Sequence, residues 1–371
     1  HPEISTLPSL YLAGYFNNGV WEHLSQGPVE QLPERFADMF AVLFDASSLV
    51  SVPGALRDGL SQIGVQEGMT TVGDNRDEIL KVDRNLFCSE ARRLMAGLGN
   101  IDTGIFLRIV HAAYEHALAT KTDRHTLFYH IHNPTSYTTL NFLSQMPDAR
   151  FLMMVREPLQ SLESWLKDPA REHDYGQIVL YILTMIYGID RVPFRQHDSI
   201  GVRLEDLKSR PKPTMQSLCN WIGITETPSL YEMTAQGKKW WGDPTSPDYD
   251  KKKEMSPFDD TCFKRPPGTL LGDRDRLLLK TLFHPFRVRF GYAEDDPDTF
   301  STSLSEARAI LHEPLQFEQK IIEQTNADPD LFCKRGDYLM LRAALGDRLD
   351  VLDELGTYPH MLTPLTIEQD G

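Results

Sequence analysis

Long apolar runs are missing from this sequence. No stretch approaches the roughly 20 consecutive apolar residues that an α-helix needs to cross a lipid bilayer, so we expect no membrane span within these 371 residues. Cysteine is also scarce, with one residue at each of positions 88, 219, 262 and 333 and no CxxC pair. This wide spacing excludes a dense disulfide framework and a cysteine-based zinc site, and it favours buried, reduced thiols in a cytoplasmic protein.

Positive charge is in short supply as well. Lys and Arg number 38 against 53 Asp and Glu, so the formal net charge is −15. A surface with this balance repels polyphosphates and anionic lipids, which excludes general nucleic-acid binding. The sequence has no repeats, and its 41% hydrophobic and 25% charged residues are ordinary for a globular protein. Length and composition predict one large folded domain or two smaller ones.

What the sequence does contain is an alternation of apolar runs and helical patterns after residue 125. Runs of strand length cover residues 126–132, 149–155 and 199–204, and helical patterns cover 136–146, 159–167, 175–189 and 215–222. Strands that alternate with helices predict a parallel sheet that is flanked by helices and joined by right-handed crossovers. We therefore expect an α/β fold.

The C-terminal part of the sequence is predicted to be helical. We expect a helix over 276–283 that ends at Pro285, then an acidic linker at residues 294–298 and a helical stretch from residue 303 to about 355. The expected organisation is an α/β domain over residues 1–292, with the acidic linker and a C-terminal helical extension over 293–371.

Arg156 directly follows the predicted strand 149–155, and Ser161 and Ser164 follow in the next predicted helix. In α/β sheets, ligands bind beyond the carboxyl ends of the strands, where this arginine is expected. The two serines lie three residues apart on the first turns of a helix, near its unpaired backbone N–H groups. A guanidinium and two hydroxyls suit a phosphate group; a surface ion pair with two solvated serines is the alternative.

Two histidines, His130 and His132, end the first predicted strand. Alternation along a strand puts both imidazoles on the same face. Three interpretations stay open: buried, hydrogen-bonded histidines, a metal site of the kind found in metallohydrolases, and general base catalysis, because imidazole titrates near neutral pH. The metal site lacks a third ligand at a recognisable spacing.

Two further segments carry charged side chains. Residues 203–207, Arg-Leu-Glu-Asp-Leu, join the third predicted strand to a helix, and Lys264 and Arg265 precede a turn at Gly268. Adjacent cations before a glycine turn suit a phosphate contact. An exposed basic loop is the alternative for this last segment.

Together and in this order, the four segments resemble the sulfotransferase family that uses 3′-phosphoadenosine 5′-phosphosulfate, over about residues 120–290. The resemblance implies a nucleotide-kinase-like α/β fold. It also implies that Arg156 and Ser164, which keep the family's spacing, hold the 3′-phosphate of the nucleotide, with Ser161 on the same helix face. Lys264, Arg265 and Gly268 then correspond to the family's late phosphate-binding loop.

The segment His-Ile-His-Asn-Pro at 130–134 resembles the family's Lys-Thr-His-x-Pro pattern, which implies that His132 is the catalytic base. His130 stands where the family often has lysine, and we expect it to donate to the developing charge. Leu204 stands where the family usually has tyrosine. The family's Pro-x-Ser-Gly-Thr-Thr loop, which binds the 5′-phosphosulfate, is not found in the sequence. Because residues 1–8 resemble the segment that follows this loop in many members, we expect the loop upstream of His1.

The resemblance implies in-line transfer of a sulfuryl group to a hydroxyl or amine of a carbohydrate or small-molecule acceptor, without a metal. Aromatic residues near the start are expected either to shape the acceptor pocket or to pack in the core, among them Tyr11, Tyr15, Phe16, Trp21 and Phe40. Two other classes stay open: an inactive relative that binds adenosine 3′,5′-bisphosphate, and a metal-dependent hydrolase that uses the two histidines.

Overall fold

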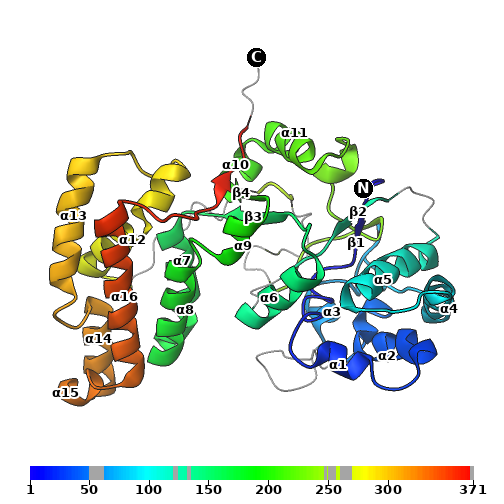
Figure 1. The fold of residues 1–371 in the computed structure, drawn as a ribbon, viewed down its shortest axis with the longest axis horizontal. Helices are drawn as coiled ribbons and strands as arrows, with labels where there is room; N and C mark the ends of the chain where they lie inside the picture. Colours follow the sequence, from blue (N-terminus) through cyan, green and yellow to red (C-terminus); the bar gives the residue numbers. More distant parts are fainter. Residues whose placement is uncertain are drawn as a thin grey trace. The chain divides into compact units, whose positions relative to one another are not determined.

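The computed structural model describes residues 1–49, 62–119, 124–131, 135–245, 249, 256–259 and 270–367 (Figure 1). The chain forms two compact units: unit 1 comprises residues 1–148 and 219–259, and unit 2 comprises residues 149–218 and 260–371. Each unit is therefore built from two separate stretches of the sequence. The expected boundary at residue 292 lies inside unit 2, and the core described below explains why.

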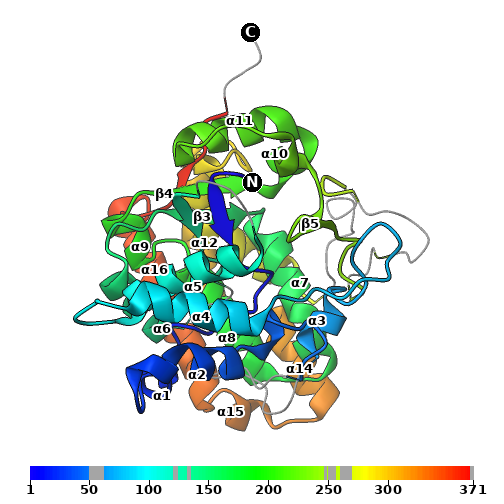
Figure 2. The same ribbon diagram turned by 90° about the vertical axis from the view of Figure 1, so that its right-hand side faces the viewer.

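Unit 1 is mainly helical, with a short parallel strand pair. Strand β1 (Ile4–Thr6) pairs with β2 (Thr126–Phe128), so the strand expected over 126–132 is confirmed in its first three residues. Its helices are α1 (Val20–Leu24), α2 (Leu32–Met39), α3 (Ile63–Gln66), α4 (Arg84–Met95), α5 (Thr103–Ala117) and α6 (Ser136–Gln145), with 3-10 turns at Val29–Gln31, Ala41–Leu43 and Pro228–Tyr231 and a hairpin of β5 (Thr234–Ala235) and β6 (Lys238–Lys239). Figure 2 shows α4 and α5 side by side.

Aromatic rings fill the core of unit 1. The Phe36 ring lies in the middle of this cluster, 4.9 Å from Phe40, 5.8 Å from Phe87 and 5.7 Å from Phe106 between ring centroids. Each of these side chains is buried, and burial of one such ring contributes roughly 1.5–3 kcal/mol to the free energy of unfolding. Four of the five aromatic residues named above as pocket or core residues, Tyr11, Tyr15, Phe16 and Phe40, are core residues, and Trp21 is half-buried against Phe106.

A buried polar group, His111, faces β1 from helix α5. Its Nδ1 lies 2.9 Å from the hydroxyl oxygen of Ser5, and the same hydroxyl donates to Glu115 Oε1 at 3.1 Å. Because the serine proton goes to the carboxylate, Nδ1–H of the neutral imidazole donates to the serine oxygen. The other ring nitrogen, Nε2, is buried and has no hydrogen-bond partner among the described residues. Burial lowers the pKa of His111 to about 3.

Unit 2 contains a three-stranded parallel sheet. Strand β4 (Ser199–Arg203) lies between β3 (Phe151–Val155) and β7 (Thr363–Pro364), and in the β3–β4 register Val155 is opposite Arg203. Helices α7 (Pro158–Arg171), α8 (Tyr175–Tyr187) and α9 (Val192–Gln196) connect β3 to β4, and α10 (Leu204–Ser209) and α11 (Pro211–Ile222) follow. These elements confirm the predicted α/β class, with short parallel sheets flanked by helices. The single sheet expected from the three predicted strands is wrong, because β2 pairs with β1 in unit 1 and β3 pairs with β4 in unit 2.

The C-terminal helices complete unit 2 and share one hydrophobic core with α7 and α8. They are α12 (Asp273–Arg289), α13 (Pro297–Ile310), α14 (Gln316–Thr325), α15 (Pro329–Phe332) and α16 (Gly336–Leu355). Since residues on α7, α8, α12, α13, α14 and α16 bury one another, the helices after residue 293 belong to the same compact unit as β3 and β4. Among the described residues no helix is both long and apolar enough to span a membrane.

The predicted end of a helix at Pro285 is wrong, because α12 continues through this residue to Arg289. A proline inside a helix removes one hydrogen bond and costs about 3 kcal/mol. Phe283 and Phe286, which flank Pro285, are both buried, and each buried phenyl ring contributes roughly 1.5–3 kcal/mol. The apolar face on both sides of the proline therefore keeps the helix continuous.

A charged pair lies inside the core between α14 and α16. Glu318 is fully buried and forms an ion pair with Arg342, whose side chain is only 12% exposed. The Tyr175 hydroxyl donates to Glu318 Oε1 at 2.6 Å, and the Leu315 N–H donates to Oε2 at 2.6 Å. Burial raises the pKa of Glu318, and the Arg342 guanidinium opposes that shift. A carboxylate with this many partners is fixed in place by α8, α14 and α16 together.

Candidate functional site

The carboxyl end of β3 and the start of α7 form the candidate site. Val155 is buried at the end of the strand, and Pro158 begins the helix at a position where a missing N–H group costs nothing. Arg156 and Glu157 are thus confined to the two-residue link between strand and helix. This geometry places a cation and an anion directly beside the first turn of α7.

Arg156 is half-buried and is oriented by its own helix. Its Nε and Nη2 groups donate to the side-chain oxygen of Gln160 at 3.2 and 3.0 Å. Ser161 and Ser164 lie on the same helix, the first half-buried and the second exposed. The structure therefore brings together the three residues predicted for phosphate binding. Gln160 was not predicted, because Arg156 precedes α7 and the spacing rule for side chains on one helix does not apply to this pair.

Glu157 is a second residue that sequence reasoning did not identify. Its Oε2 accepts a hydrogen bond from the Gln160 N–H at 2.8 Å, which caps the N-terminus of α7. Its Oε1 accepts from Arg287 Nε at 3.0 Å, and both side chains are about one-fifth exposed. The first turn of α7 therefore already holds one carboxylate, and Arg287 from the end of α12 balances its charge.

The neighbouring strand β4 ends in a second charged cluster. The guanidinium carbon of Arg203 lies 4.6 Å from the centre of the Tyr292 ring, and the Tyr292 hydroxyl donates to Glu205 Oε2 at 2.8 Å. Burial and the nearby Glu205 carboxylate raise the pKa of Tyr292, so the hydroxyl keeps its proton near neutral pH. Leu204 stands where the resembled family has tyrosine. It lies between Arg203 and Glu205 in the sequence, and its side chain is half-buried.

The remaining predicted site residues lie in the other unit or outside the described residues. His130 is exposed and follows β2 in unit 1. His132, Lys264, Arg265 and Gly268 lie outside the described residues. Within the described part of the chain, no group of three or more His, Cys, Asp or Glu side chains could hold a metal ion.

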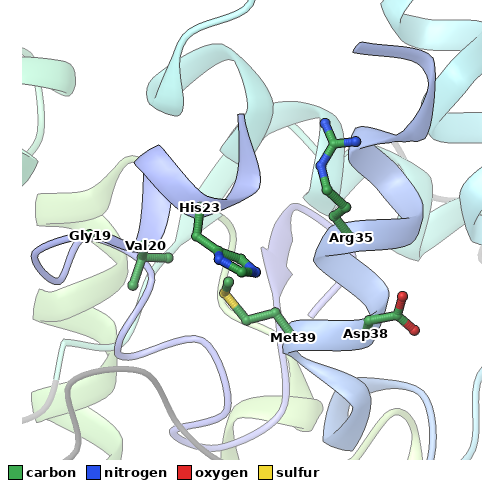
Figure 3. A pocket seen from close by; sticks show the side chains of 6 residues that line it. All are labelled: Gly19, Val20, His23, Arg35, Asp38 and Met39. Atoms are coloured by element: carbon green, nitrogen blue, oxygen red, sulfur yellow. The ribbon is translucent and has the colours of Figure 1, made fainter. Parts of the chain in front are cut away.

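Unit 1 has a cavity of its own, of about 550 Å³, between α1 and α2 (Figure 3). Figure 3 shows His23 projecting from α1 toward Met39 on α2. Arg35 is bound to the backbone at the end of α1 and in the following loop, because its Nε donates to the Leu24 carbonyl at 2.7 Å and its Nη1 to the Pro28 carbonyl at 3.0 Å. Asp38 accepts from Arg84 Nη2 at 2.6 Å. Arg35 therefore stabilises the α1–α2 connection, and Asp38 links α2 to α4.

No family model matches the chain, and neither the curated proteins nor the solved structures include a match to it. The function is therefore inferred from the residues of the chain itself.

Proposed function

We propose that the chain is a sulfotransferase that moves a sulfuryl group from 3′-phosphoadenosine 5′-phosphosulfate to a hydroxyl or amine of a carbohydrate or small-molecule acceptor. The observation that carries the proposal is the position of Arg156, directly after β3 and directly before α7, with Ser161 and Ser164 on the first turns of that helix. The order and spacing of the other segments in the sequence support the same function.

Arg156, Ser161 and Ser164 would hold the 3′-phosphate of the nucleotide. A guanidinium donates two parallel hydrogen bonds to a phosphate, and serine hydroxyls add neutral donors. Gln160 supports this role, because its side-chain oxygen holds Nε and Nη2 of Arg156 in place before a ligand arrives. The Glu157 carboxylate already accepts a hydrogen bond from the Gln160 N–H at the start of α7. Because this N–H group is occupied, the phosphate would bind to side chains of α7.

Transfer requires the acceptor oxygen or nitrogen to attack sulfur in line with the leaving phosphate oxygen. A new bond from the acceptor to sulfur forms while the bond from sulfur to the 5′-phosphate breaks, and adenosine 3′,5′-bisphosphate leaves with the electron pair. In the proposal His132 takes the acceptor's proton, and His130 donates to the developing charge. Lys264 and Arg265, with the turn at Gly268, close over the 3′-phosphate.

The expected result for Arg156→Ala is an approximately 100-fold weaker affinity for adenosine 3′,5′-bisphosphate. Loss of a charged hydrogen-bond donor to phosphate costs on the order of 2–3 kcal/mol, which corresponds to this factor. Calorimetric titration of the wild-type chain and the variant measures it. Arg171→Ala is the matched control, because Arg171 is an exposed arginine at the other end of α7.

Two outcomes would contradict the proposal. A folded wild-type chain that does not bind the bisphosphate excludes the nucleotide site, and equal weakening by Arg156→Ala and Arg171→Ala shows that the effect is not local to the candidate site. Binding without turnover in a radiolabelled sulfate-transfer assay over a panel of hydroxylated and amine acceptors identifies the inactive nucleotide-binding relative instead.

A further inference from the structure

A cavity of about 260 Å³ lies in unit 2 at the end of β4, and it contains none of the residues assigned above to the nucleotide. Arg203 and Asp206 contribute from the end of β4 and from α10, Arg210 follows α10, and Arg289 ends α12. The segment around β7 and beyond it completes the wall. Three separate stretches of the chain, residues 203–210, 289–290 and 364–367, all within unit 2, therefore converge on one cavity.

The cavity is positively charged in a chain whose net charge is −15. Three arginines face one carboxylate, Asp206, so the formal charge of the lining is positive by two. Asp206 is shared, since its Oδ1 lies 2.7 Å from Arg210 Nη2 and its Oδ2 lies 3.6 Å from Arg203 Nε. One carboxylate cannot neutralise three guanidinium groups, and an anion that enters would meet a local excess of donors.

The orientation of two of these arginines is fixed by contacts outside the cavity. Arg203 packs its guanidinium on the Tyr292 ring, and its Nε is buried without a hydrogen-bond partner among the described residues. Arg289 Nη1 donates to the Met361 carbonyl at 2.9 Å, which holds the side chain against the segment before β7. Because a guanidinium carries five N–H donors, these contacts leave donors to spare for a ligand.

Part of the cavity lining is apolar and firmly packed. It is formed by Phe290 and by residues after β7, among them Leu365. The Phe290 ring lies so close to β4 that a Cβ atom at Gly201 would lie 2.6 Å from it, and the ring also stacks on Phe286 at 4.4 Å between centroids. The cavity lining therefore combines cationic and apolar side chains that contacts within unit 2 hold in place.

We infer that this cavity binds a small phosphomonoester, whose phosphate contacts Arg203, Arg210 and Arg289 and whose apolar body packs on Phe290 and Leu365. A doubly charged tetrahedral anion suits three convergent guanidinium groups better than a singly charged ester does. The apolar lining residues favour an ester with an aromatic or aliphatic group over inorganic phosphate. The inference is independent of the proposed sulfuryl transfer.

Titration of the full chain with phenyl phosphate tests the inference, with phenyl sulfate and inorganic phosphate as comparison probes. We expect phenyl phosphate to bind more tightly than either. Arg210→Gln should weaken its binding about tenfold, as loss of one charged hydrogen bond predicts. Asp206→Asn should strengthen it by roughly threefold or more, because the competing carboxylate becomes neutral. The two substitutions are thus expected to change the affinity for phenyl phosphate in opposite directions.

Arg171→Gln is the control for a general loss of positive charge, and Arg156→Ala removes the candidate nucleotide site. Both should leave phenyl phosphate binding unchanged. The inference is overturned if a folded wild-type chain does not bind phenyl phosphate at millimolar concentrations. It is also overturned if Arg210→Gln and Asp206→Asn both leave the affinity unchanged, or if Arg156→Ala alone abolishes binding, since the ligand would then occupy the other site.

Discussion

Replacing Glu318 with leucine should lower the free energy of unfolding by about 3–5 kcal/mol, because the substitution leaves the Arg342 guanidinium in the core without its carboxylate. Arg342 is 12% exposed, so its guanidinium is largely shielded from solvent. The Tyr175 hydroxyl and the Leu315 N–H would also lose their acceptor. Urea-induced unfolding of the wild type and the variant measures the difference.

The double variant Glu318→Leu/Arg342→Leu separates the buried charge from the rest of the effect. If the unpaired guanidinium is the main penalty, the double variant should regain more than half of the lost stability. Asp350→Ala, which breaks the exposed ion pair with Arg308 at 2.7 Å, is the matched control and should cost no more than about 1 kcal/mol. A double variant that is less stable than Glu318→Leu would show that the unpaired charge is not the main cause of the lost stability.

Unit 1 should lose stability in mild acid because of His111. The pKa of this imidazole is about 3 in the folded chain and near 6.5 in the unfolded chain, since burial disfavours the cation. A second proton would also place a donor on Nε2, which has no acceptor among the described residues. The contribution of neutral His111 to the free energy of unfolding is fully present above pH 6.5 and decreases as the pH drops toward 3. The expected loss is about 2 kcal/mol between pH 7 and pH 5.

Chemical unfolding at pH 7 and pH 5, followed through tryptophan fluorescence in a Trp165→Phe background so that the remaining four tryptophans all lie in unit 1, measures this loss. The variant His111→Phe keeps a ring of similar size but cannot titrate, so its unfolding free energy should change much less between the two pH values. His116→Gln, an exposed histidine on the same helix, should keep the wild-type loss. Equal losses in the wild type and His111→Phe would rule out His111 as the cause.

Most helices and strands in the middle of the chain are predictable because the hydrophobic patterns that indicate them lie within each segment of the sequence. The strand expected over 199–204 and the helix expected over 136–146 are confirmed within one residue at each end. Strand β7 was not predicted, since two residues, one of them Pro364, carry no periodic pattern and pair only because β4 lies beside them. The continuation of α12 through Pro285 likewise depends on packing that the sequence alone does not reveal.

The candidate site likewise has residues that the sequence predicts and residues that it does not predict. Arg156, Ser161 and Ser164 follow from a strand end, a proline and helical spacing, all within nine residues. Glu157 is adjacent to them, but its role depends on Arg287, which is 130 residues away in the sequence. Contacts of this kind arise only when α12 packs beside α7, and no sequence pattern in one chain indicates them.

The interleaving of the two units has a consequence for synthesis on the ribosome. Unit 1 needs residues 219–259 to be complete, and these emerge only after the whole β3–α10 segment of unit 2 has been translated. Strand β4 in turn waits for β7 near residue 363, almost at the end of this sequence. The two units therefore cannot fold strictly one after the other during translation, and the edge of β4 that pairs with β7 stays unpaired until residues 363–364 have been translated.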